Sequence, residues 1–423
     1  MINNIIDKLK KKGLISQITN ECDLMQIVAK NRIALYCGFD PTADSLHIGH
    51  LLPLLCLRHF QLLGHTPIVL IGGATSLIGD PSFKDKLRDI NFDMSNIKQW
   101  ENKIINQISL FLDFNCGNNS AIIVNNYEWL SKLNFIQFLR NIGGCFSVNS
   151  MINRKSVRER VNRPDQGISF AEFSYSLLQA YDFYFLYKKY NAILQIGGSD
   201  QWGNITSGIR LTYKLIKKKV YGLTVPLLIQ SNGNKFGKTE QGTIWLDKRK
   251  TSTYRFYQFW MNISDTDVLR YLKLFTFLNT QDIENITKIN QEKNNPFYLQ
   301  RILAEEITKL VHGKEDCAMA IRLTRCLFSE KINNLKLSDF IQLKKDHMFS
   351  ISVRGLLDLK SALVASFLAS SKSQAHAMII SKSIRINNKV QDNYNYYFLD
   401  SDKIFMKFTL LSRGKKNHCL LCW

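Results

Sequence analysis

The sequence predicts an α/β protein with a doubly wound parallel sheet in its first half, followed by an α-helical region and a small α+β domain. Three observations support this fold class. Short apolar strands alternate with helix-length segments over the first 230 residues or so. Polar and glycine-containing motifs follow several of these strands directly. The chain of 423 residues is also too long for one ordinary core, so two or three domains are expected.

The first strand and helix enclose the most informative stretch, Tyr36-Cys-Gly-Phe-Asp-Pro-Thr-Ala-Asp-Ser-Leu-His-Ile-Gly-His50. Residues 33–37 have the pattern of a short buried strand, and the leucine spacing after residue 46 is helical. His47 and His50 are therefore predicted in the first helical turn, on one face. Free N–H groups and the helix dipole make such a turn an anion site. A zinc half-site and an ordinary helix cap are the alternatives.

The later elements continue the alternation. We expect strands at 67–72, 121–125, 192–196 and 224–230, a long helix from about residue 169 and another from residue 202. Ligands of such sheets bind at the carboxyl ends of the strands, near the point where the strand order reverses. The histidine motif, Asp80, Gly197-Gly-Ser-Asp200 and a lysine-containing loop at 235–239 all follow predicted strands, so they should converge on one cleft.

A second motif, Lys235-Phe-Gly-Lys-Thr239, follows the last of these strands and a turn. Two lysines three residues apart in a glycine-containing loop suit a mobile clamp on a polyphosphate. A solvated basic loop is the alternative for this motif taken by itself.

The composition indicates a soluble globular protein with a polyanionic partner. The formal charge is +21, from 56 basic and 35 acidic residues, and residues 353–423 alone carry 11 Lys/Arg against 4 Asp/Glu. Compositional drift toward lysine is the alternative. Nine scattered cysteines fit reduced thiols in a cytoplasm, and Cys419-Leu-Leu-Cys422 lacks the second pair of a zinc site, so no protein metal site is expected. No apolar run approaches the roughly 18–20 residues of a membrane span, and no secretory signal is visible.

His47-Ile-Gly-His50 together with Lys235-Phe-Gly-Lys-Thr239 is similar to the paired signature of class I aminoacyl-tRNA synthetases. The chain resembles the bacterial tyrosyl-tRNA synthetases of that class over essentially its whole length. The shared motifs include Gly72-Gly-Ala-Thr-Ser-Leu-Ile-Gly-Asp-Pro81, Phe173-Ser-Tyr-Ser-Leu-Leu-Gln-Ala-Tyr-Asp182 and Gln195-Ile-Gly-Gly-Ser-Asp-Gln-Trp-Gly-Asn204. The resemblance implies a tyrosine–tRNA ligase of the cytoplasm that uses ATP with Mg²⁺, L-tyrosine and tRNA(Tyr).

The expected domains combine the residue pattern with this resemblance. They are a Rossmann-like catalytic domain over 1–230, a helical tRNA-binding domain with the lysine loop over 231–335, a linker over 336–352 and an RNA-binding domain over 353–423. An apolar insertion at about 127–165 is implied to join two subunits into a homodimer, and a buried intrachain helix pair is its alternative. The RNA-binding domain resembles one shared with a ribosomal small-subunit protein and pseudouridine synthases. His376 and Ala377 stand where its helix usually carries arginines.

Activation of an amino acid by ATP needs no proton transfer at the reacting atoms, so positioning and cations near the phosphates can supply the catalysis. The resemblance implies that one set of residues contacts the phosphates and pyrophosphate: His47, His50, Thr42, Lys235, Lys238 and Thr239, joined by Lys84 and Arg88. For the adenosine and adenylate it implies Cys37, Gly38, Asp40, Gly198 and Asp200.

Tyr175, Gln179 and Asp182 are spaced to line one face of the predicted helix, as a pocket wall or as a solvated face. A phenol both donates and accepts, so its pocket needs an acceptor and a donor. The resemblance implies that Asp182 and Tyr36 fill these roles. It further implies that Asp80, Tyr175 and Gln179 hold the amino group, and that Gln195 and Gln201 orient the tyrosine.

Three other interpretations remain open at this point. The sibling tryptophanyl-tRNA synthetase shares the motifs, but Tyr36 with Asp182 and the RNA-binding tail argue against it. Another nucleotidyltransferase with a His-x-Gly-His motif would lack the helical and RNA-binding domains. An RNA-binding or splicing protein with an inactive synthetase domain is the third.

Overall fold

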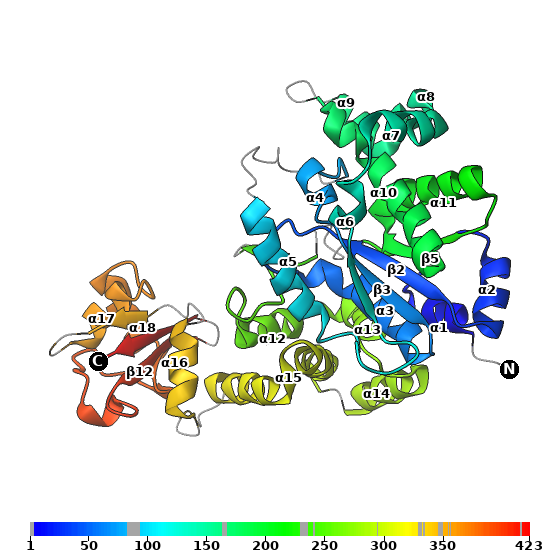
Figure 1. The fold of residues 1–423 in the computed structure, drawn as a ribbon. Coiled ribbons are helices and arrows are strands. Elements are labelled where there is room, and N and C mark those ends of the chain that lie inside the picture. The colour runs from blue at the N-terminus through cyan, green and yellow to red at the C-terminus, as the bar shows by residue number, and fades with distance from the viewer. Residues whose placement is uncertain are drawn as a thin grey trace. The chain divides into compact units, whose positions relative to one another are not determined.

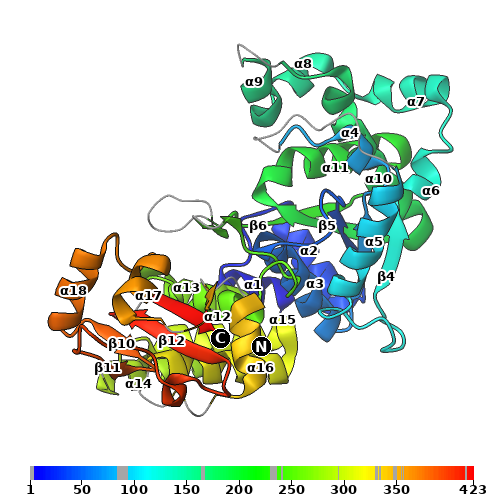
Figure 2. The ribbon, with the colours of Figure 1, turned by 90° about the vertical axis from the view of Figure 1, so that its left-hand side faces the viewer.

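The computed structural model describes residues 4–423 with gaps at 83–93, 163–166, 229–235, 240–241, 294, 329–331, 333–334, 346–349, 354, 356 and 415–416. The chain forms two compact units, and it passes between them more than once. One unit comprises Met1–Asp247 and Ser264–Leu299, and the other comprises Lys248–Ile263 and Gln300–Trp423. Figures 1 and 2 show the ribbon in two views at right angles.

The first unit is built on a six-stranded sheet in the order β1-β6-β5-β2-β3-β4. Its neighbouring strands are parallel, except that β1 pairs antiparallel with β6. The strands are β1 (Gln17–Ile18), β2 (Ala34–Phe39), β3 (Thr66–Ile71), β4 (Ile122–Asn125), β5 (Ala192–Gly198) and β6 (Tyr221–Val225). The predicted doubly wound parallel sheet is therefore confirmed.

The strand order reverses beside β2. The chain runs from β2 outward through β3 to β4, and then returns to β5 on the other side of β2. Right-handed crossovers therefore place the helices of the two halves on opposite faces of the sheet (Figure 1). The helices of this unit outside the insertion are α1 (Ile5–Lys12), α2 (Glu21–Lys30), α3 (Leu51–Leu62), α4 (Thr75–Ile78), α5 (Met94–Ile108), α10 (Phe170–Tyr190), α11 (Trp202–Ile216), α13 (Asp265–Phe275) and α14 (Thr280–Lys293). The reversal creates a crevice at the carboxyl ends of β2 and β5.

Helix α10 begins where the sequence predicts because Ser169 caps it. The Ser169 side chain accepts from the Glu172 N–H, and the Glu172 side chain accepts from the Ser169 N–H in return. The helix ends at Asn191 in the left-handed conformation. Its buried Phe183 packs against Tyr36 of β2, so the helix lies directly over the strand that precedes the histidine motif.

The predicted insertion folds into short helices: α6 (Tyr127–Leu130), α7 (Phe135–Asn141), α8 (Val148–Ile152) and α9 (Lys155–Val161). Helix α7 has no buried residue, and Phe135 and Ile136 on it are 64% and 67% exposed. An apolar face of this kind is unusual on a surface that stays in water.

The second unit holds a five-stranded sheet in the order β11-β10-β12-β13-β9, with apolar clusters on both faces. Alternation along β12 and β13 sends Leu411 and Leu421 to one cluster and Leu410 and Leu420 to the other. Its strands are β9 (Ser350–Ser352), β10 (Ile384–Ile386), β11 (Lys389–Val390), β12 (Phe408–Arg413) and β13 (Asn417–Cys422). Its helices are α12 (Thr253–Met261), α15 (Tyr298–Phe328, with a break at Gly313), α16 (Leu337–Lys345), α17 (Leu359–Ala365) and α18 (Lys372–Ile380).

The structure differs from the predicted elements in four places. The expected linker 336–352 contains α16 and β9, because Phe340 and Leu343 of α16 are buried against the sheet. The last strand of the parallel sheet ends at Val225, since Pro226 has no N–H to continue the ladder, and 229–230 lie outside the described residues. The helical region 231–335 also includes a small hairpin of β7 (Lys238–Thr239) and β8 (Gly242–Thr243). Finally, α3 begins at Leu51 and follows a 3₁₀ turn (Ile48–His50), so both histidines precede the α-helix.

Lys12, at the end of α1, is a buried cation that holds two distant parts of the first unit together. Its ammonium donates to the carbonyls of Thr276 (2.9 Å) and Leu278 (2.8 Å), just beyond the carboxyl end of α13. Its side chain is only 7% exposed. This is where a helix end most favours a positive charge.

Lys12→Met should therefore destabilise the protein by about 1–3 kcal/mol, because it leaves buried carbonyls without a donor. The measurement is the midpoint of urea unfolding of the full chain. Lys11→Met, on the exposed neighbour in the same helix, is the matched control and should change the midpoint little. Equal midpoints for the two variants would contradict the role assigned to Lys12.

Candidate active site

The histidine motif forms a compact turn at the carboxyl end of β2. His47 Nδ1 accepts from the Gly49 N–H (3.0 Å), and His50 Nδ1 accepts from the His47 N–H (3.1 Å). The two rings stack with their centroids 4.0 Å apart. Burial, and secondarily the neighbouring His47, lower the pKa of His50. A neutral ring that accepts at Nδ1 carries its proton on Nε2, so both rings present an Nε2–H donor.

The residues after the lysine motif pair with the backbone of the histidine motif. Ile48 N–H donates to Ile244 O (3.0 Å), and Leu246 N–H donates to Leu46 O (2.9 Å). Between them, the Trp245 ring lies edge-on to His47, with centroids 6.2 Å apart. The two predicted motifs are therefore brought together by main-chain hydrogen bonds.

Gly237 shows how closely the two motifs pack. Its φ is +80°, and a Cβ at this position would lie 2.3 Å from the Ile48 side chain. The preceding Phe236 is buried and packs on Tyr271 and Phe275 of α13, at centroid distances of 4.8 and 5.8 Å. The lysine motif is thus anchored on its aromatic residue, and only a glycine fits next to the histidine turn.

Some predicted phosphate ligands lie outside this description. Lys84, Arg88 and Lys235 are not among the described residues. Lys238 and Thr239 are described by their backbone alone, in β7. Thr42 is exposed beside the turn, and its N–H donates to Asp40 O (2.8 Å). The proposed clamp remains a prediction for these side chains.

The side chain of Gln107 on α5 forms hydrogen bonds with the residues just before His47. Its Oε1 accepts from the Leu46 N–H (2.8 Å), and its Nε2 donates to Ser45 Oγ (3.2 Å). The same Ser45 Oγ accepts from the Asp247 N–H (3.3 Å). Ser45 therefore links the histidine turn to the residues that follow the lysine motif, and Gln107 holds Ser45 and Leu46 in place. Sequence analysis missed Gln107, because a polar residue on a helix carries no mark of such a partner.

A group of buried polar side chains links α10 to β2 and to the residues that follow β4. Asp182 is buried and accepts from Trp129 Nε1 (2.8 Å) and Asn126 Nδ2 (3.0 Å). Burial raises the pKa of Asp182 to about 7, partly opposed by those two hydrogen bonds. Tyr36 is fully buried, and its hydroxyl has no hydrogen-bond partner among the described residues. Burial, and secondarily the Asp182 charge, raise the pKa of Tyr36.

A second group of polar side chains at this edge of the sheet consists of carboxylates and amides. Asp80 accepts from Gln201 Nε2 (2.7 Å), and Gln201 Oε1 accepts from Gln179 Nε2 (3.2 Å). Burial raises the pKa of Asp80, while the hydrogen bond from Gln201 opposes the rise. Gln179 Oε1 and Gln195 Oε1 are buried without a partner among the described residues. Unpaired buried oxygens point to a ligand that supplies donors.

The predicted adenosine residues gather at the same edge of the sheet. Asp40 accepts from Tyr175 Oη (2.8 Å) and Thr75 Oγ1 (2.8 Å), so Tyr175 contacts a predicted adenylate residue in this structure. Asp200 accepts from Gln201 Nε2 (3.1 Å). The remaining three lie in the strands themselves: Cys37, which is buried, and Gly38 are in β2, and Gly198 is the last residue of β5.

Sequence analysis also missed Asn126, Trp129 and Thr75. Asn126 Nδ2 donates to Thr75 Oγ1 (3.0 Å) as well as to Asp182, and its Oδ1 accepts from the Ala74 N–H (2.8 Å). The available signal was the position of Asn126, directly after β4, where polar residues of this fold face the crevice.

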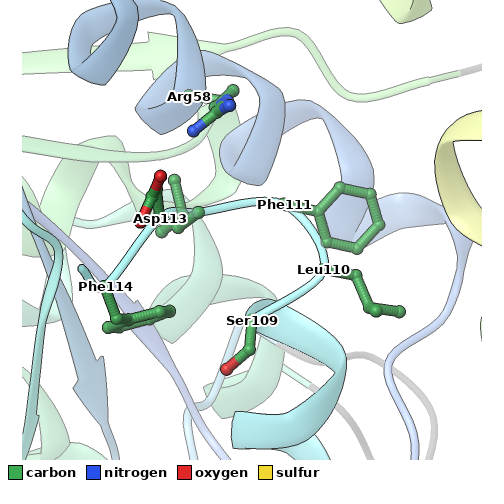
Figure 3. Close-up of a pocket in the computed structure, with 7 residues that line it drawn as sticks. Arg58, Ser109, Leu110, Phe111, Asp113 and Phe114 are labelled. Carbon is green, nitrogen blue, oxygen red and sulfur yellow. The ribbon is translucent and has the colours of Figure 1, made fainter. Parts of the chain in front are cut away.

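Figure 3 shows a different hollow, of about 480 Å³, which contains none of the predicted site residues. It is lined by Arg58, Ser109, Leu110, Phe111, Leu112, Asp113 and Phe114. Across the described residues, no group of three or more His, Cys, Asp or Glu side chains is arranged to hold a metal ion. No helix in that part of the chain is long and apolar enough to cross a membrane.

The fold and the paired motifs define a class I aminoacyl-tRNA synthetase, and the comparisons agree. Residues 29–329 match the family described as "tRNA synthetases class I (W and Y)", and residues 339–421 match "Tyrosine--tRNA ligase SYY-like C-terminal domain". The chain is 57% identical to a tyrosine–tRNA ligase of Buchnera aphidicola over 99% of both chains. It is 52% identical to one of Escherichia coli over 100% of this chain and 99% of the relative. The chain therefore belongs to the tyrosine–tRNA ligase family.

Solved structures agree with this assignment. A C-terminally truncated mitochondrial tyrosyl-tRNA synthetase of Aspergillus nidulans is 32% identical, with a TM-score of 0.69 over 77% of this chain and 94% of that one. A tryptophanyl-tRNA synthetase of Encephalitozoon cuniculi shares the fold, with a TM-score of 0.53 and 15% identity. The match covers 74% of this chain and 87% of that one.

If Gln107 positions His47, Gln107→Leu should slow amino-acid activation roughly five- to thirtyfold, as expected when about 1–2 kcal/mol of hydrogen bonding is lost at the transition state. The measurement is ATP–pyrophosphate exchange in a double-mutant cycle with His47→Ala. The effect of Gln107→Leu should shrink in the His47→Ala background, because Gln107 acts largely through His47.

Lys103→Ala is the control for this cycle. It lies one turn earlier on α5, where its ammonium pairs with Asp44 (3.1 Å), and should leave exchange nearly unchanged. Fully additive losses from Gln107→Leu and His47→Ala would contradict a positioning role.

Proposed function

We propose that this chain activates L-tyrosine with ATP and transfers it to the terminal adenosine of tRNA(Tyr). The observation that carries the choice of amino acid is the buried pair of Tyr36 and Asp182. A phenol in this pocket would donate to the Asp182 carboxylate and accept from the Tyr36 hydroxyl, which has no other partner among the described residues. A side chain without the hydroxyl would leave both groups buried and unpaired.

Asp80, Tyr175 and Gln179 would hold the α-amino group, with Gln195 and Gln201 orienting the substrate. The carboxylate and the unpaired amide oxygens are acceptors, which suits an ammonium group. The adenosine would lie against the ends of β2 and β5, lined by Cys37, Gly38, Asp40, Gly198 and Asp200.

In the first step, the tyrosine carboxylate attacks the α-phosphorus of ATP and pyrophosphate leaves in line. The Nε2–H groups of His47 and His50 would donate to phosphate oxygens as their charge grows. Thr42, Lys235, Lys238 and Thr239 would close over the pyrophosphate, joined by Lys84 and Arg88. Mg²⁺ would enter with ATP as its counter-ion and needs no ligand set from the protein.

In the second step, a ribose hydroxyl of the terminal adenosine attacks the tyrosyl carbonyl and releases AMP. The charge of +21 supports a tRNA partner, since phosphate contacts dominate such binding. The exposed apolar face of the insertion, with Phe135, Ile136 and Val148, supports a homodimer. The nine free cysteines support a cytoplasmic location.

The test of this proposal is ATP–pyrophosphate exchange with each of the twenty standard amino acids. Exchange with tyrosine alone is expected. Exchange with tryptophan instead would overturn the assignment of Tyr36 and Asp182 while keeping the chemistry. Absence of exchange in the folded protein would favour an RNA-binding protein with an inactive synthetase domain.

The affinity for tyrosine should fall as the pH falls through about 7, where Asp182 takes up a proton. Tyrosine would bind the ionised carboxylate better, so affinity should drop about tenfold from pH 8 to pH 6. Equilibrium dialysis with labelled tyrosine measures it directly. Asp182→Asn should bind weakly with a flat profile, and an unchanged pH dependence in this variant would show that another group titrates.

A further inference from the structure

Tyr394 is an exposed aromatic ring held between two helices of the second unit. It lies after β11 and is 44% exposed. The His376 ring of α18 meets it edge to face, with centroids 4.8 Å apart. The ammonium of Lys360, on α17, lies 5.7 Å from its centroid. Figure 2 shows α17, α18 and β11 in the same part of this unit.

The backbone that carries Tyr394 is fixed by its own hydrogen bonds. Gln391 Oε1 accepts from the Asn393 N–H (3.0 Å), and Asn393 Oδ1 accepts from the Asn395 N–H (3.0 Å). Asn393 O also accepts from the Tyr396 N–H (3.3 Å). Turns of this kind reduce the entropy that binding must remove, so the ring is presented ready for a partner.

The surroundings of the ring are basic. Burial acts to raise the pKa of Asp358, but the Ser361 hydrogen bonds and the charges of Lys372 and Lys360 lower it on balance. Lys372 and Lys360 therefore both lie near the start of α17, and Asp358 there is already engaged as the helix cap. A polyanion would meet two ammonium groups on this side of the domain.

We propose that Tyr394, together with Lys360 and His376, is a stacking platform for an unpaired base of the tRNA. The inference rests on the proposed function, since it takes tRNA as the partner. Bases stack on exposed tyrosine rings in single-stranded segments of RNA, and a neighbouring lysine adds a phosphate contact. This arrangement replaces the arginines that the predicted RNA-binding helix lacks around His376.

The chemistry of the patch favours RNA over a protein partner. A protein interface would be expected to surround an aromatic anchor with further apolar side chains. Here the ring contacts a lysine and an imidazole, and Asp392 nearby is paired with Lys382 (3.8 Å). The excess of 11 basic over 4 acidic residues across 353–423 is the complement of a phosphate backbone.

The test measures tRNA(Tyr) affinity of the full chain by filter binding, with three variants. Tyr394→Ala should weaken binding about five- to a hundredfold, the range for loss of one base stack. Tyr394→Phe should bind normally, because stacking needs the ring and not the hydroxyl. Tyr397→Ala removes another tyrosine that is 54% exposed three residues later, and should bind normally as the matched control.

Lys360→Ala should reduce the slope of log affinity against log salt by about 1, as expected for one lost phosphate contact. Equal binding by Tyr394→Ala and the parent, or equal losses in Tyr394→Ala and Tyr397→Ala, would overturn the platform. Tyrosine-dependent pyrophosphate exchange must stay unchanged in all variants. Absence of exchange in the parent, or failure of the parent to bind tRNA(Tyr), would count against the proposed function instead.

Discussion

The organisation of the site depends on one short ladder of main-chain hydrogen bonds, between residues 46–48 and residues 244–246. These segments are nearly two hundred residues apart in sequence; the first overlaps the histidine motif, and the second follows the lysine motif. The ladder fixes the segment that follows the lysine motif against the histidine turn. Gln107 reinforces it from α5, and Phe236 anchors the other end on α13. Any residue that shifts this ladder shifts both motifs at once, so chemistry in this site is sensitive to contacts well outside it.

The buried carboxylates of the site are held in place by neighbouring side chains. Asp182 accepts from Asn126 and Trp129, and Asp80 accepts from Gln201, so the protein itself orients these acceptors. Burying such carboxylates is unfavourable, as the raised pKa values of both show. The Tyr36 hydroxyl and the amide oxygens of Gln179 and Gln195, which have no partner among the described residues, add to that cost. A ligand that satisfies all of them recovers this energy on binding, and one that satisfies only some recovers less.

The sequence pattern predicted the sheet, the long helix after Ser169 and the meeting of the two signature motifs. These features depend on strand periodicity, helix caps and motifs, which are all formed by residues close together in sequence. The pattern could not predict Asn126, Trp129 or Gln107, whose partners lie 51 to 62 residues away and leave no trace in local periodicity. Helix α16 was expected to be a linker because its composition is polar and charged. Only the tertiary structure shows that Phe340 and Leu343 are covered by the sheet. The 3₁₀ turn at His47 was missed because a capping histidine and a helical histidine have the same spacing in sequence.

The large sequence separation between Lys12 and its hydrogen-bond partners has a consequence for biosynthesis. Its carbonyl partners at residues 276 and 278 are more than 260 positions further along the chain. During translation, at about 5–20 residues per second, the amino-terminal helix therefore waits more than ten seconds for the segment that completes its packing. During that interval the nascent sheet lacks α13, so Phe236 also lacks the residues on which it packs. A ribosome stalled before residue 278 would therefore carry a first unit without the contacts that hold its amino-terminal helix.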